Sequence, residues 1–182
     1  EDMPDPAFKS ARIRCVFPRS GGVEGYEAAL KLLCDRAEAV IRKGATLLVL
    51  TDRGQDEETV PIPMLQAVGL IHHHLIEKGM RMRASIIADT GTVLDVHTLA
   101  ILISFGTSAV CPYLACQAIR ATALSGEYGS TTPQKAVARF FEAMEKGLLK
   151  VMAKRGVSTL RSYCGAQLFT AIGLGRKLVK QC

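Results

Sequence analysis

The chain has 182 residues, a length typical of one domain, and a chain of this size buries ~70% of its unfolded surface on folding. Apolar residues make up 48% of the sequence and no apolar run reaches membrane-spanning length, which indicates an α/β globular protein and excludes disordered, collagen-like and membrane-spanning classes. The formal net charge of +6 comes partly from a basic last third, so nucleic acid and acidic proteins are partner classes to weigh.

The first ten residues, 1–10, are expected to form a flexible leader. The start EDMPDP is acidic and contains proline, so it has neither the basic nor the apolar region of a signal peptide. We therefore expect an intracellular protein.

Four strand–helix units follow between residues 11 and 124. Each predicted strand is a short apolar or alternating run, and each predicted helix carries its apolar residues on one face at 100° per residue. The predicted strands are 12–17, 45–51, 84–89 and 108–113, and the predicted helices are 25–43, 61–78, 93–105 and 114–124. The run 45–51 is continuously apolar, so we expect this strand to be buried on both faces. The alternation predicts a parallel sheet with right-handed crossovers, either open or resembling half of a (β/α)₈ barrel.

Residues 125–182 have a different, helical character. A long amphipathic helix is predicted from Pro133 to about Arg155, with either Thr131 or Thr132 as its N-cap. Ser158 and Thr159 can cap a short turn after it, and the chain then continues as a short helical tail.

Two polar turns follow the second and third predicted strands. Thr51, Asp52 and Arg53 end the second strand, and Asp89 and Thr90 end the third. The carboxyl ends of parallel strands lie along one edge of a sheet, where ligands bind in open α/β folds, so we expect both turns on the same edge. One interpretation is structural, with Arg53 pairing with a carboxylate and Asp52 satisfying the loop backbone. The other is that the turns border a ligand or a tunnel.

The histidines lack the spacing that metal chemistry requires. His72, His73 and His74 are adjacent, and on a helix adjacent side chains diverge by about 100°, so they cannot share one ion. We expect His72 and His97 to be hydrogen-bonded core residues and His73 and His74 to contact a neighbouring domain. No Gly-rich loop matches a nucleotide-binding motif. The sequence therefore predicts no catalytic, cofactor-binding or metal-binding residue.

The six cysteines are expected to be reduced. Cys15 and Cys111 fall in predicted strands and Cys34 lies on the apolar side of a predicted helix, where free cysteine behaves as a small hydrophobic residue. Cys111 and Cys116 have a ligand-like spacing, but a soft metal cluster needs three or four thiolates. We expect a structural pair there.

Five runs of the chain, in this order, resemble the second half of the central domain of glutamate synthase. They cover about residues 11 to 175, and the second and fourth are long enough to be specific. The runs are TDRG (51–54), PIPMLQAVGLIHHHLIEKGMRMR (61–83), VHTLAILISFGTSAVCPYLA (96–115), EKGLLKVMAKRGVSTLRSYCGAQLF (145–169) and AIGL (171–174). The chain departs from the family pattern at Asp89, usually Glu, and at Cys111, usually Asn.

The resemblance implies a segment of a large polypeptide, either a large (alpha) subunit or a single-chain enzyme. In that family a glutaminase domain releases ammonia, which passes through an internal tunnel to 2-oxoglutarate at the reduced FMN of a synthase domain. The parent enzyme is thus implied to be an oxidoreductase that uses FMN and an iron–sulfur cluster, with NAD(P)H or ferredoxin as electron donor. The segment itself is expected to bind none of these. Its compartment would be the cytoplasm or an organelle such as the plastid.

The function implied for this chain is that of a structural connector and ammonia conduit between the glutaminase and FMN-binding domains. Residues 125–182 would lead toward the FMN-binding domain. The two polar turns, with His73 and His74, would line the tunnel or an interface. We also expect the isolated chain to expose apolar surface on 93–105 and 165–174.

Other functions remain open at this point. The main alternative is a stand-alone α/β module that binds a small anion or a protein partner, and a flavin site built by this chain alone is a weaker one. No membrane partner is expected. Nucleic-acid binding is not expected either, because Phe140 and Phe141 lie on the apolar stripe of the basic helix rather than beside its lysines.

Overall fold

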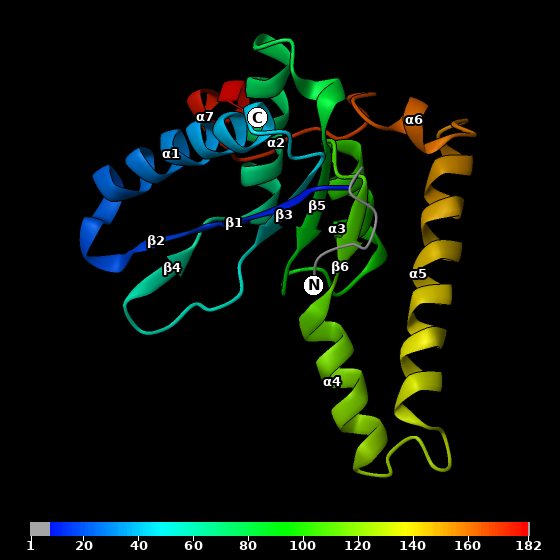
Figure 1. The fold of residues 1–182 in the computed structure, drawn as a ribbon. Helices are drawn as coiled ribbons and strands as arrows, with labels where there is room; N and C mark the ends of the chain where they lie inside the picture. Colours follow the sequence, from blue (N-terminus) through cyan, green and yellow to red (C-terminus); the bar gives the residue numbers. More distant parts are fainter. Residues whose placement is uncertain (1–7, 182) are drawn as a thin grey trace.

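The sheet at the centre of the molecule is parallel. The computed structural model describes residues 8–181, so most of the expected leader and Cys182 lie outside the described part. Four strands pair in the order β1-β3-β5-β6, all parallel, and a helix follows each of them in the chain. These elements are β1 (Ser10–Arg14), α1 (Gly22–Arg42), β3 (Leu47–Thr51), α2 (Met64–Glu77), β5 (Ser85–Asp89), α3 (Val96–Ser104), β6 (Ala109–Cys111) and α4 (Tyr113–Leu124). The predicted parallel α/β architecture is confirmed (Figure 1).

The first predicted strand, 12–17, is two strands in the structure. β1 ends before Cys15, and β2 (Val16–Pro18) pairs antiparallel with β4 (Thr59–Pro61) in a separate two-stranded sheet. Cys15 separates the two because its N–H donates to the carbonyl of Thr51, 2.8 Å away, and its carbonyl accepts from the N–H of Ile62, also at 2.8 Å. The alternation of side chains continues from β1 into β2 although the two strands pair with different neighbours. The sequence pattern therefore could not locate the break between them.

Short elements mark where the other expected boundaries were wrong. β4 occupies the end of the segment expected to be an acidic loop, and Pro61 closes β4 rather than opening the helix. Pro63 is instead the residue before α2, which begins at Met64. Two 3₁₀ turns, η1 (Arg19–Gly21) and η2 (Arg81–Arg83), precede α1 and β5.

The two central strands of the sheet are buried on one face beneath α1 and α2. Leu48 and Leu50 of β3 and Ile86 and Ala88 of β5 are each 0% exposed and belong to one apolar cluster with residues of these helices. On the opposite face Val49 is half-buried. The expected burial of β3 on both faces is therefore wrong, because the covering helices lie on one side of it.

The helix α3 is shorter than predicted and is not buried all round. Asp95 caps it by accepting a hydrogen bond from the N–H of Thr98 at 2.7 Å, so Val93 and Leu94 precede the helix. One side of α3 packs closely on α5 (Pro133–Lys154), where an added Cβ on Gly147 would lie 2.3 Å from Cγ2 of Val96.

The predicted long helix and short helical tail are confirmed. Thr132, rather than Thr131, caps α5, and its hydroxyl accepts from the N–H of Lys135 at 3.3 Å. Thr159 caps α6 (Leu160–Tyr163), and α7 (Arg176–Gln181) follows after an irregular segment. α4 and α5 form a helical hairpin that extends from the sheet, and the chain then returns above the sheet to α7 (Figure 1). Within residues 8–181, no helix is both long and apolar enough to span a bilayer.

Candidate functional site at the carboxyl ends of the strands

The two predicted polar turns lie together on one edge of the sheet. The parallel register places Thr51 of β3 opposite Asp89 of β5, and Asp89 opposite Cys111 of β6. Asp52 and Thr90 follow directly, and the N–H of Asp52 donates to the carbonyl of Asp89 at 3.3 Å. We call Thr51, Asp52, Arg53, Asp89 and Thr90 the strand-end cluster.

Arg53 and Asp89 form the ion pair of this cluster. The Nε of Arg53 donates to both carboxylate oxygens of Asp89, at 3.0 and 2.8 Å, and the hydroxyl of Thr51 donates to Oδ2 at 2.9 Å. Burial of Asp89 by itself raises the pKa of its carboxyl group, but hydrogen bonds from Arg53 and Thr51 outweigh burial, and the net pKa is lowered. The carboxylate is therefore ionised at neutral pH.

Asp52 holds the loop after β5. Its carboxylate accepts hydrogen bonds from the hydroxyl of Thr90 at 2.5 Å and from the N–H of Gly91 at 3.2 Å. The hydroxyl of Thr90 in turn accepts from the N–H of Thr92 at 3.2 Å. The contacts expected under the structural interpretation are present: Arg53 pairs with a carboxylate and Asp52 satisfies loop backbone. That the two turns also border a ligand or a tunnel stays a prediction. Both acidic residues are buried and hydrogen-bonded.

The sequence did not identify Tyr113, Cys111 and Arg14 as neighbours of the cluster. The Cζ of Arg53 lies 3.9 Å from the centre of the Tyr113 ring, a cation–π contact. A terminal nitrogen of Arg14 donates to the carbonyl of Gly54 at 2.6 Å. The position of Tyr113 at the end of the fourth predicted strand was the signal available, because that strand must end on the same edge.

Cys111 carries one of the two departures from the family pattern, and its neighbour Asp89 carries the other. The two are register partners on adjacent strands. Partial desolvation of the sulfur and the Asp89 carboxylate raise the pKa of the Cys111 thiol. The two departures expected from the resemblance therefore fall on one pair of neighbouring residues.

The charged groups of the strand-end cluster are held in place by one another. Two of its three charged groups are carboxylates already bound by donors, and Arg53 is tied by its ion pair and its ring contact. The Arg53 side chain is 41% exposed. The cluster can therefore fix the loops after β3 and β5 against each other and present one face of a guanidinium group to a neighbouring surface.

His72 makes the hydrogen bond that was expected, but it is only half-buried. Its Nδ1 accepts from the Nε of Arg81 at 2.9 Å, and the terminal nitrogens of Arg81 donate to the carbonyls of Ala84 and Gly106. Burial and the charge of Arg81 lower the pKa of His72 to about 4. This arrangement ties the end of α2 to the segments that precede β5 and β6.

His73 and His74 lie apart from the strand-end cluster. α2 starts near the carboxyl ends of the strands and runs back toward the start of β5, so its last turns lie at the opposite edge of the sheet. The Nδ1 of His73 donates to the carbonyl of Gly69 at 2.9 Å, and the Nε2 of His74 lies 3.0 Å from a carboxylate oxygen of Glu38 on α1. Contact of these two histidines with another domain stays a prediction.

The sequence predicted that His97 and Cys111 would be core residues, and this is wrong. Both are exposed. The ring of His97 lies edge-on to Phe169, with centroids 5.8 Å apart. Cys15 and Cys34 are buried, and burial raises their thiol pKa values to about 12 and about 11. The five cysteines of the described part are free thiols.

Solved structures show the same fold at low sequence identity. Flavocytochrome b2 with sulfite bound aligns with a TM-score of 0.53 and 15% identity, over 81% of this chain and 38% of that one. A mutant flavocytochrome b2 with benzoylformate aligns with a TM-score of 0.55 and 16% identity, over 80% of this chain and 37% of that one. These similarities concern the fold alone.

Sequence relatives are far more similar. The ferredoxin-dependent chloroplastic glutamate synthase of Oryza sativa subsp. japonica is 44% identical over 96% of this chain and 12% of its own length. The NADH glutamate synthase of Schizosaccharomyces pombe is 36% identical over 97% of this chain and 8% of its own length. The NADPH glutamate synthase large chain of Bacillus subtilis is 38% identical over 96% of this chain and 11% of its own length.

The chain thus spans about a tenth of the length of these curated relatives. A sequence model of the glutamate synthase central domain matches residues 2–175. That match covers nearly the whole chain, and the relatives agree with it. The chain belongs to the glutamate synthase central domain family.

Proposed function

We propose that this chain is one segment of a glutamate synthase, an oxidoreductase that makes glutamate from glutamine and 2-oxoglutarate. The observation that carries the proposal is the match to the central domain over residues 2–175, in a chain that covers only 8% to 12% of three glutamate synthases. A stand-alone binding module is not favoured, because nearly all of the chain aligns within these much longer proteins. The compartment, cytoplasm or plastid, stays a prediction.

Within that enzyme the chain acts as a connector and conduit between the glutaminase and FMN-binding domains. The strand-end cluster supports this role because its buried, hydrogen-bonded carboxylates fix the loops after β3 and β5 in one arrangement. A fixed loop surface suits the wall of a passage or a domain contact, where small displacements change what can pass. The segment holds its neighbours in place and supplies no reacting group.

The residues described do not fit the cofactors of the proposed parent. Nowhere in the described part do three His, Cys, Asp or Glu residues gather as metal ligands, and an iron–sulfur cluster needs at least three thiolates or their equivalents. An FMN phosphate would meet the carboxylates of Asp52 and Asp89 at the strand ends, where Arg53 is already paired. We assign FMN, the cluster and the NAD(P)H or ferredoxin contacts to segments outside this chain.

The connector role is tested by how much of the ammonia released by glutamine hydrolysis is converted to glutamate. Arg53→Met in the native polypeptide removes the guanidinium that holds Asp89, and we expect less glutamate formed per glutamine hydrolysed. Glutamate formation from added ammonia should stay within about twofold of the unaltered enzyme, which corresponds to about 0.4 kcal/mol in the barrier.

The matched control is Glu142→Gln, which breaks an exposed pair on α5 far from the strand ends. This variant should leave the ratio of glutamate formed to glutamine hydrolysed unchanged. An unchanged ratio in Arg53→Met, or an equal loss of both half-reactions, would contradict the conduit role of this site.

A further inference from the structure

A hollow lies between α4, α5 and the loop that joins them. Its volume is about 430 Å³, within the range of about 300–1,000 Å³ that is usual for binding sites. We call it the hairpin groove, and its lining residues are Ile119, Tyr128, Thr131, Ala136, Arg139 and Phe140. The groove thus combines an apolar floor with a single cation.

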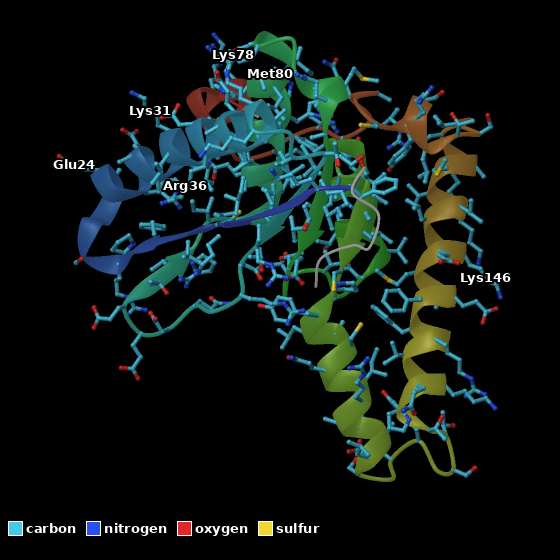
Figure 2. The ribbon with its side chains drawn as sticks, viewed as in Figure 1. Glu24, Lys31, Arg36, Lys78, Met80 and Lys146 are labelled. Carbon is cyan, nitrogen blue, oxygen red and sulfur yellow. The ribbon has the colours of Figure 1, made fainter. Side chains whose placement is uncertain are left out.

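The rim of the hairpin groove is positively charged. Lys135 and Arg139 are both exposed and lie one turn apart on α5, so their side chains share a face. Within the described part neither forms an ion pair, whereas Lys146 on the same helix pairs with Glu142 at 2.6 Å. Figure 2 shows Lys146 on the outer side of α5, directed away from the body of the molecule. Arg139, which lines the groove, and Lys135, one turn before it on α5, are therefore available to an acidic group.

The hairpin also carries an uncovered apolar stripe. Leu114, Ala118, Ala121 and Leu124 recur on α4 at spacings of three and four residues, and all four are exposed, Leu124 by 77%. The hairpin stands out from the sheet and meets the rest of the chain mainly through α5 (Figure 1). A helix that is apolar on two sides needs a second covering surface.

We propose that the hairpin groove is a docking site for an acidic, amphipathic segment from another part of the same polypeptide. An apolar side chain of that segment fills the groove beside Phe140, and a neighbouring Asp or Glu pairs with Arg139 and Lys135. The occupant belongs to the same polypeptide because about nine-tenths of each relative lies outside the aligned region. This inference rests on the proposed function and names one surface by which the connector holds its neighbour.

Zero-length coupling of amines to carboxylates in the native polypeptide tests the proposal. A carbodiimide joins a lysine only to a carboxylate within ion-pairing distance, and mass spectrometry of the digest identifies both residues. Lys135 should couple to an Asp or Glu outside these 182 residues, next to apolar residues. Coupling of Lys146 to Glu142, 2.6 Å apart, is the internal positive control.

A variant separates specific docking from random coupling. Arg139→Glu introduces like-charge repulsion at the groove and should lower the yield of the Lys135 product at least about fivefold. Lys150→Glu lies on the same face of α5 but about 16 Å farther along the helix, so it should leave that yield unchanged. Equal loss in both variants would show that general charge, not the groove, governs the coupling.

Other outcomes would overturn the proposal. Coupling of Lys135 to a second copy of this chain would assign the surface to self-association. Sedimentation of the protein with phosphatidylserine vesicles that is lost in Arg139→Glu would assign it to a membrane surface. If the polypeptide is many times heavier than 19.6 kDa and Lys135 still couples to nothing outside the chain, the docking site is wrong while the proposed function stands.

Discussion

At the scale of single residues, Asp89 is the carboxylate that pairs with Arg53 in the strand-end cluster. Its carboxylate accepts hydrogen bonds from Arg53 and Thr51. Asp89→Asn should lower the free energy of unfolding by about 1.5–3 kcal/mol at neutral pH, the usual range for hydrogen bonds to a charged group. The measurement is urea unfolding of the chain. Glu142→Gln, whose side chain is 60% exposed, should leave it unchanged.

The effect of Asp89→Asn should also depend on pH. The pKa of Asp89 is lowered in the folded state, so its ionised form contributes stability above the unfolded pKa of about 3.9, and this is lost as the pH falls through the lower folded value. The difference between Asp89→Asn and the unaltered chain should therefore shrink below about pH 4. A difference that is constant from pH 7 to pH 3 would contradict the assignment.

His72 gives a pH dependence of the same sign in a higher pH window. The folded state lowers its pKa from 6.5 to about 4, so between these two values the unfolded chain takes up a proton that the folded chain does not. Stability should fall as the pH drops from about 6.5 to about 4, and His72→Gln should remove that part of the loss. NMR titration of the ring checks the pKa directly, and a midpoint at or above 6.5 would show that His72 does not accept from Arg81.

At the scale of elements, the crossing of α3 and α5 depends on one glycine. A Cβ on Gly147 would lie 2.3 and 2.9 Å from the two Cγ atoms of Val96, and a β-branched side chain has little freedom to move away. Gly147→Ala should therefore lower the free energy of unfolding by about 1–3 kcal/mol through overpacking.

Gly25→Ala is the matched control for this substitution. Gly25 lies inside α1 with nothing within 4 Å of an added Cβ, so alanine should stabilise the chain there by about 0.5–1 kcal/mol. If both alanines raised the melting temperature, the close contact between α3 and α5 would not exist in solution.

The elements also show what the sequence could and could not predict. Long periodic segments such as α1 and α5 were found because their apolar stripes repeat over five or more turns, and Thr132 was one of two capping candidates on chemical grounds. β4 was missed because three residues carry no usable period and its pairing with β2 is a tertiary contact.

The candidate site also has features that the sequence could predict and features that it could not. The meeting of Thr51, Asp52 and Arg53 with Asp89 and Thr90 could be predicted, because parallel pairing fixes where strand ends lie. The stacking of Arg53 on Tyr113 could not, because it depends on the direction in which α4 leaves β6. The exposure of His97 was not predicted either. The sequence of an apolar helix does not show which of its sides remains uncovered by neighbouring elements.

At the scale of the whole molecule, apolar surface remains uncovered. Ile172 is 89% exposed and Leu174 56% exposed, as expected for 165–174, whereas α3 is partly covered by α5 rather than free. Surface of this kind marks contact sites. The isolated chain should enhance the fluorescence of a hydrophobic dye while keeping a cooperative thermal melt, and a dye-silent compact monomer would contradict this.

The central claim is that these residues work as part of a much longer enzyme. It is tested most directly by the mass of the native polypeptide, measured by blotting a source extract with an antibody against residues 131–155. The account predicts a band many times heavier than 19.6 kDa, because the relatives are about ten times longer than the aligned region. A single band near 19.6 kDa would contradict it, since no glutaminase or FMN-binding domain could then share the chain.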